Sequence, residues 1–184
     1  MAATSRGFRL FLLSSLSVLA GCAEQPRAPA LRDDPVYINE REGLRFLVPE
    51  NWVQQGSANL PAGKLAKEHS LVRFVRKSRD KKAILEITVA GLEESADLAA
   101  HLAGPSFSAK GWHRTASREP VETQGLTGTR FTFTGRVGKD EIIKEVVAFR
   151  KGERVYFFNG LFFPGDNQAR DQIRQTIKGT IWKN

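Results

Sequence analysis

The sequence predicts an α+β domain in which a mainly antiparallel β-sheet is flanked by helices, as an α/β/α sandwich. Three observations lead to this fold class. Short alternating segments within residues 36–90 are typical of antiparallel hairpins. Residues 129–163 form a predicted meander whose last strand, 154–163, is apolar on both faces and therefore needs cover on both. Residues 166–179 have the periodicity of an amphipathic helix, which supplies one of those covers.

The N-terminus has the pattern of a secretory signal peptide. Arg6 and Arg9 precede a short apolar run, Leu10–Ala20. A membrane-spanning helix needs about 20 apolar residues, so this run is too short to be an ordinary one. A basic start followed by a short apolar core is typical of a signal for export.

The next residues, Leu19-Ala20-Gly21-Cys22, resemble the lipobox of bacterial lipoproteins. The resemblance implies that Cys22 receives a diacylglyceryl thioether, that residues 1–21 are cleaved off, and that the new amine can be acylated. Two or three acyl chains, at about 0.8 kcal/mol per buried CH₂, would anchor the protein permanently to a membrane. The alternative is an ordinary signal peptide with a cysteine near its end. Because Cys22 is the one cysteine of the chain, the sequence also excludes an intrachain disulfide.

Ala23 follows the lipobox cysteine, where an Asp would resemble the signal for retention in the inner membrane. In a cell with two membranes, the resemblance therefore implies an exported protein at the outer membrane, facing the periplasm.

The charge of the chain is basic, with 28 Lys and Arg against 20 Asp and Glu. Removal of residues 1–21 takes two arginines and no acid, so a surplus of about six positive charges remains. Such a surface favours an anionic lipid, an acidic cell-wall polymer or an acidic protein as partner. Nucleic acid is not expected as a partner outside the cytoplasm.

The organisation predicted from the sequence is a signal peptide at 1–21, a lipidated Cys and Pro-rich tether at 22–35, and one globular domain at 36–184. The tether contains three prolines and no apolar periodicity. In an extended polyproline-like conformation it would reach about 40 Å at most.

The domain is expected to open with a hairpin of strands 36–39 and 44–48, which Pro49 ends. Residues 54–70 are predicted to be a loop. A second hairpin follows, with strands 71–76 and 83–90.

In strand 83–90, alternation of apolar residues with Glu86 and Thr88 predicts one buried and one solvent-facing side. A short helix is predicted at 95–103, with Ser95 as its N-cap and Gly104 at its end.

The meander is predicted to contain strand 129–134, a turn at 135–140, strand 141–150 and strand 154–163. In the last strand Val155, Phe157 and Leu161 are expected on one face and Tyr156, Phe158 and Phe162 on the other.

For the closing helix, Asp166 is the predicted N-cap and Gly179 the predicted end. Ala169, Ile173 and Ile177 form its apolar stripe, and the Ile181–Trp182 tail is expected to pack back on the domain.

The order of elements resembles the PsbP-like group, which includes DcrB-like lipoproteins. The residues that carry the resemblance are Gly43-Leu44-Arg45-Phe46 leading into Val48-Pro49-Glu50-Asn51-Trp52, together with the meander and the closing helix. The resemblance implies an antiparallel sheet between helices and an accessory or binding role without catalytic residues. Trp52 is interpreted as a core residue, with contact to a partner as the alternative.

No catalytic, cofactor or metal site is predicted. His69, His101 and His113 are far apart and match no metal-binding motif. Residues 135–140 contain two glycines and a lysine but lack the spacing of a phosphate loop, so a hairpin turn is predicted. Cys22 is assigned to lipid and leaves no thiol nucleophile.

One cluster is a candidate for partner binding. Six basic residues lie in a ten-residue window: Arg73, Arg76, Lys77, Arg79, Lys81 and Lys82. They are interpreted either as a solvated hairpin tip that protects a sheet edge or as an electrostatic contact with one of the anionic partners named above.

The function predicted from the sequence is therefore a membrane-anchored lipoprotein that acts as a non-catalytic binding or accessory module at the cell envelope. An envelope enzyme with an active site dispersed along the sequence is the alternative. A purely structural envelope protein is the third.

Overall fold

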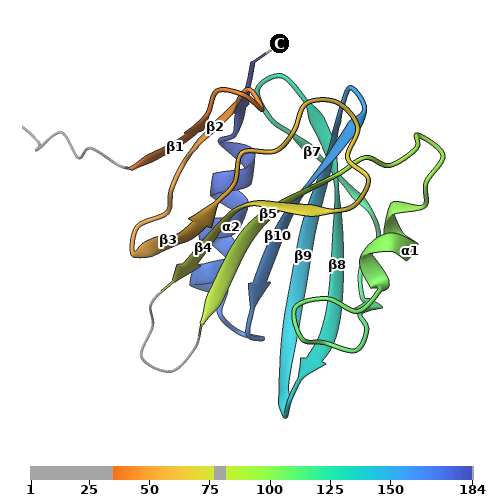
Figure 1. Ribbon diagram of the computed structural model, residues 1–184. Coiled ribbons are helices and arrows are strands. Elements are labelled where there is room, and N and C mark those ends of the chain that lie inside the picture. The colour runs from red at the N-terminus through yellow and green to blue at the C-terminus, as the bar shows by residue number, and fades with distance from the viewer. Residues whose placement is uncertain (1–34, 77–81, 184) are drawn as a thin grey trace, which may run out of the picture. The chain divides into compact units, whose positions relative to one another are not determined.

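The computed structural model describes residues 35–76 and 82–183 (Figure 1). The predicted signal peptide, the Cys22 lipidation site and nearly all of the tether lie outside these ranges, so they remain predictions. No helix in the described ranges is long and apolar enough to cross a membrane.

The elements follow one another as β1 (Val36–Asn39), β2 (Leu44–Leu47), β3 (Trp52–Ser57), β4 (His69–Arg76), β5 (Ala83–Ala90), α1 (Leu98–Ala103), β6 (His113–Arg114), β7 (Glu119–Glu122), β8 (Thr127–Val137), β9 (Asp140–Lys151), β10 (Arg154–Phe162), α2 (Asn167–Lys178) and β11 (Ile181–Trp182). They form an eight-stranded sheet and a three-stranded sheet. The large sheet has the order β3-β4-β5-β10-β9-β8-β6, with β7 also paired to β8. The small sheet has the order β1-β2-β11. The predicted α+β class is confirmed, because the paired strands are antiparallel and helices lie against the large sheet.

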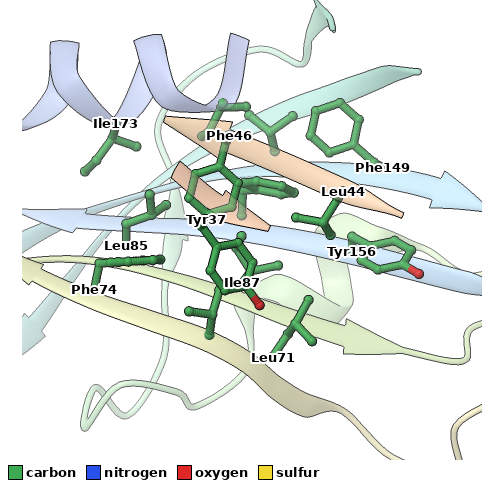
Figure 2. Packing of buried hydrophobic residues seen from close by; sticks show 14 of the residues in the cluster. Tyr37, Leu44, Phe46, Leu71, Phe74, Leu85, Ile87, Phe149, Tyr156 and Ile173 are labelled. Atoms are coloured by element: carbon green, nitrogen blue, oxygen red, sulfur yellow. The ribbon is translucent and has the colours of Figure 1, made fainter. Parts of the chain in front are cut away.

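One face of the large sheet is covered by α2 and the small sheet. Figure 2 shows Tyr37, Leu44 and Phe46 of the small sheet packed towards side chains of the large sheet, with Ile173 of α2 beside them. The predicted stripe of α2 is fully buried here, and Trp182 returns to the same core. Burial of this aromatic-rich layer is the main source of stability for this half of the domain.

The other face is covered by α1 and the segment that follows it. Leu102 of α1 and Trp112 pack there against a second apolar cluster. The predicted alternation of β10 is confirmed, since Val155, Phe157 and Leu161 belong to this cluster and Tyr156, Phe158 and Phe162 to the opposite one. The large sheet is therefore the middle layer of a sandwich, as the doubly apolar strand predicted.

The ends of α2 also match the sequence. Asp166 is the N-cap, and its Oδ1 accepts a hydrogen bond from the Ala169 amide at 3.1 Å. Gly179 is the C-cap, with its amide donating to the Gln175 carbonyl. Trp52 is a core residue, as interpreted, and its Nε1 donates to Gln172 of α2 at 2.9 Å.

Several boundaries differ from the prediction. Residues 54–57 belong to β3 rather than to a loop, because Gln54, Gly56 and Ser57 pair with β4, and β3 forms one edge of the large sheet. Strands β6 and β7 were not predicted. The turn between β8 and β9 is short, because β8 continues to Val137 and β9 begins at Asp140.

The N-cap of α1 is Asp97, not Ser95, because the Asp97 carboxylate accepts the Ala99 amide at 2.9 Å. Strand β5 has no solvent-facing side, which corrects the prediction for Glu86 and Thr88. Both side chains are buried and hydrogen-bonded. The Glu86 carboxylate accepts a hydrogen bond from the Ser70 hydroxyl at 2.6 Å, and the Thr88 hydroxyl accepts one from the Asn159 side-chain amide at 3.1 Å.

Candidate functional site

A groove of about 690 Å³ lies on the α1 side of the large sheet. We call it the α1-face groove. Its lining comes from strands of the sheet and from the segment after α1: Arg73, Lys82, Ile84, Phe107, Ser108, Val137, Asp140, Ile142, Leu161 and Phe163. Most of these side chains are aliphatic or aromatic, and three are charged.

The floor of the groove is set by strand register. Ile84 of β5 lies opposite Leu161 of β10, and Ile142 of β9 is on the same side of the sheet. These side chains point out of the pleat on the α1 side, and no residue of α1 itself is part of the groove lining. The sheet thus presents an apolar surface next to the loop that follows the helix.

A tight turn forms one wall. Phe107 and Ser108 both have left-handed backbone conformations, with φ of 52° and 65°, and the Ala109 amide closes the turn on the Ser106 carbonyl at 3.0 Å. A bulky aromatic residue rarely adopts this conformation, and it costs free energy. The rest of the loop must therefore hold the turn in place.

Lys144 provides that restraint from beneath. Its Nζ donates to the Leu102 carbonyl at 2.5 Å and to the Ser106 hydroxyl at 3.2 Å, and it lies 4.7 Å from the centre of the Trp112 ring. The Trp112 indole also donates to the Ser106 hydroxyl, at 2.9 Å. Together these contacts tie the end of α1 and the start of the turn to β9.

Burial lowers the pKa of Lys144 from its ordinary 10.5 to about 8, partly offset by the charge of Glu68. Burial by itself would raise the pKa of Glu68, but hydrogen bonds with His101 and Thr88 and the charge of Lys144 bring it below its usual range. The His101 ring contacts the Glu68 carboxylate at 2.8 Å and stacks on Phe157. These groups form a second link between α1 and the sheet.

The polar groups of this cluster are hydrogen-bonded to one another. The Ser106 hydroxyl already accepts two hydrogen bonds, and the Lys144 side chain that would activate it is only 1% exposed. A nucleophile needs an open approach for its substrate and a base with a free lone pair. The geometry supports a restraining role instead.

Arg73 and Lys82 give the groove its positive edge, opposed in the lining by Asp140. Arg73 lies across from Glu86 in the β4–β5 register, but the Glu86 carboxylate accepts the Ser70 hydroxyl. The buried Nε of Arg73 has no hydrogen-bond partner among the described residues. A buried guanidinium nitrogen without a partner is costly unless an anion or water satisfies it.

The structure divides the basic cluster predicted from the sequence. Arg73 and Lys82 come together at the groove. Lys77, Arg79 and Lys81 lie outside the described residues, so their role in partner binding stays a prediction.

The assignment of Arg76 to an exposed binding surface is wrong. Its side chain is on the opposite face of the sheet, 9% exposed, where Nη2 pairs with Asp166 Oδ2. Arg76 follows Arg73 by three residues in an alternating strand, and an odd spacing places two side chains on opposite faces. Its charge is used inside the fold.

The three histidines lie on separate elements, β4, α1 and β6, and their roles as ordinary residues remain predictions. Within residues 35–76 and 82–183, no group of three His, Cys, Asp or Glu residues is arranged to hold a metal ion. The glycine-containing segment near residue 138 joins β8 and β9 as a hairpin, as predicted, with Gly138 at a φ of 65°.

Sequence reasoning missed the loop residues Phe107 and Ser108 and the function of Lys144. For the loop no signal was available, since nothing in the sequence marks Phe107 as left-handed. For Lys144 there was one. Lys144 lies between Ile142 and Val146 on the same face of the strand, and a lysine on an apolar face needs partners for its charge.

Comparison with known proteins shows the fold. The solution structure of the cyanobacterial PsbP protein, CyanoP, from Synechocystis sp. PCC 6803 superposes with a TM-score of 0.55, at 12% sequence identity, covering 81% of this chain and 92% of that one. The domain thus has the PsbP-like fold that the resemblance implied. No family model matches the sequence, and no curated protein matches it.

Proposed function

We propose that the protein is a non-catalytic binding module whose α1-face groove takes an anionic amphiphile, a molecule with an acyl chain and a carboxylate or phosphate group. The observation that carries the proposal is the buried Nε of Arg73, which has no hydrogen-bond partner among the described residues and lies at the edge of an apolar groove. An apolar lining with a small number of polar groups is the usual composition of a ligand site.

The groove has a suitable size and chemistry for such a ligand. Its volume of about 690 Å³ lies within the range of small-molecule sites. The acyl chain would lie on Ile84 and Leu161 beneath the Phe107 ring. The head group would then meet the guanidinium of Arg73, which favours planar anions with two oxygens.

The setting that we propose is the cell envelope. The lipobox-like Leu19–Cys22 supports export and lipid anchoring at Cys22, and Ala23 supports the outer membrane facing the periplasm. The basic charge of the chain supports an anionic lipid, a cell-wall polymer or an acidic protein among its partners. The PsbP-like fold is compatible with an accessory role and supplies no catalytic residues to this proposal.

Lipidation is tested by mass spectrometry of protein extracted from bacterial membranes. We expect a chain that begins at Cys22 and carries diacylglycerol, and we expect Cys22→Ser to prevent this modification. An intact, unmodified Cys22 thiol on the membrane-bound wild type would contradict the proposal.

Ligand binding is tested by titration with 11-(dansylamino)undecanoic acid, a fluorescent fatty-acid probe, in competition with dodecanoate. Arg73→Gln should weaken binding about tenfold or more, because it removes a charge-assisted hydrogen bond. Arg170→Gln, on an exposed arginine of α2, is the matched control and should bind as the wild type does.

A second pair of variants tests the apolar wall. Phe107→Gly and Ser108→Gly both relieve a left-handed backbone, but only the first removes the aromatic ring. We expect Phe107→Gly to lose binding and Ser108→Gly to retain it. If Arg73→Gln and Phe107→Gly both bind the probe as tightly as the wild type, the groove is not the site.

A further inference from the structure

The outer face of the small sheet carries exposed aliphatic side chains. Val36 and Leu47 lie opposite each other in the β1–β2 register, and Ile38 is two residues further along the same face of β1. Their exposed fractions are 49%, 56% and 55%. We call Val36, Ile38 and Leu47 the aliphatic patch. Alternate residues of both strands point inward to the core, so the sheet is apolar on both faces.

A basic side chain accompanies the patch. Arg45 of β2 is exposed and lies between Ile38 of β1 and Ile181 of β11 in register. Lys183 follows β11 and pairs with Glu40 at 2.5 Å. Aliphatic side chains next to an exposed arginine suit a surface that is apolar beneath and anionic at its boundary.

The path of the chain places the patch at the start of the domain. The Val48 amide donates to the Pro35 carbonyl at 2.8 Å, so the last tether residue is held against the small sheet. Twelve residues, Ala23–Asp34, lie between Pro35 and Cys22. Even fully extended, they would keep the small sheet within about 40 Å of an anchored Cys22.

We propose that the aliphatic patch lies on an anionic bilayer, with its three side chains among the lipid head groups and Arg45 against lipid phosphate. This proposal rests on the membrane anchoring proposed above and concerns a different surface from the α1-face groove. Docking of the domain on the membrane would fix the orientation of the domain, and therefore the direction in which the α1-face groove opens relative to the bilayer. The competing occupant is a second copy of the chain, added at the free edge of β1.

The experiment uses the full chain purified from bacterial membranes and placed in vesicles of phosphatidylcholine with one-fifth phosphatidylglycerol. A single thiol is introduced by Leu47→Cys and labelled with an NBD fluorophore. Val53→Cys is the matched control, because Val53 of β3 is an exposed aliphatic residue, at 43%, outside the small sheet. The wild type should take up no label, since its Cys22 would be blocked by lipid.

We expect NBD at position 47 to shift its emission to shorter wavelength and to be quenched by nitroxide-labelled lipid, while NBD at position 53 does neither. Adding Arg45→Gln, or omitting phosphatidylglycerol, should reduce the shift at position 47. Equal responses at both positions, or none at position 47 in protein that floats with the vesicles, would overturn the proposal.

Two further outcomes separate the causes of failure. A blue shift at position 47 that appears without vesicles and grows with protein concentration would assign the patch to a second copy and overturn the proposal. Failure of the wild type to float with vesicles, together with labelling of Cys22, would refute the anchoring and the docking that rests on it.

Discussion

Removal of Arg76 should destabilise the fold, contrary to the behaviour expected of a surface lysine or arginine in a basic cluster. The Arg76 and Asp166 side chains are 9% and 11% exposed, and they join β4 to the start of α2. Asp166 uses its two oxygens separately, Oδ1 to cap α2 and Oδ2 to pair with Arg76. Arg76→Gln would leave that carboxylate charged and nearly buried without its cation.

The size of the effect follows from this geometry. Breaking a buried ion pair by removing one partner costs about 3–5 kcal/mol. Asp166 would retain the Ala169 amide and the positive end of the α2 dipole, so the lower end, about 3 kcal/mol, is expected. At about 2–4 °C per kcal/mol for a domain of this size, the melting temperature should fall by about 6–12 °C.

The assay is urea unfolding followed by tryptophan fluorescence, as a double-mutant cycle with Asp166→Asn. Asparagine keeps an N-cap acceptor, so the cycle isolates the charge interaction from the loss of the cap. We expect a coupling free energy of about 2 kcal/mol. Arg73→Gln is the control and should cost less than about 1 kcal/mol, because its buried Nε has no hydrogen-bond partner among the described residues. A cost for Arg76→Gln no larger than that of Arg73→Gln would refute the reasoning.

Two other predictions concern the packing and the titration of the domain. Gly128→Ala should lower the free energy of unfolding by about 2–3 kcal/mol, because the new Cβ would lie 2.6 Å from the buried Phe149 ring. Gly56→Ala is the control, because no atom lies within 4 Å of its new Cβ, and it should change the free energy of unfolding by less than about 0.5 kcal/mol in the same urea titration. Because the pKa of Lys144 is lowered from 10.5 to about 8, the folded state binds fewer protons than the unfolded chain between these values, so stability should rise from pH 8 to pH 10. Urea midpoints across that range should show the rise in the wild type and its loss in Lys144→Met, and an equal rise in both would contradict the assignment.

The main elements of the fold could be predicted because their patterns were local. The stripe of α2, its two caps and the doubly apolar β10 each depend on neighbours within a few residues, and all three are confirmed. Strand β3 was missed because Gln54–Ser57 is polar, and it is a strand only through its pairing with β4. Such pairing is a long-range property that no local pattern contains.

The groove was only half predictable for the same reason. Arg73 and Lys82 were found as members of a basic cluster, but the faces that they occupy depend on register and on the bulge in β4. Phe107 reaches the groove through a left-handed turn that Lys144 secures from another part of the chain. These are tertiary contacts, so the site could be assembled only from the structure.

Binding of an anionic amphiphile in the α1-face groove can be observed residue by residue in an NMR titration of the isotope-labelled protein with dodecanoate. We expect saturable amide shifts that are largest at Ile84, Phe107 and Leu161, that are small at Ile173 on the opposite face, and that weaken in Arg73→Gln. Shifts centred on another surface, or no saturable shifts at these three residues, would contradict it.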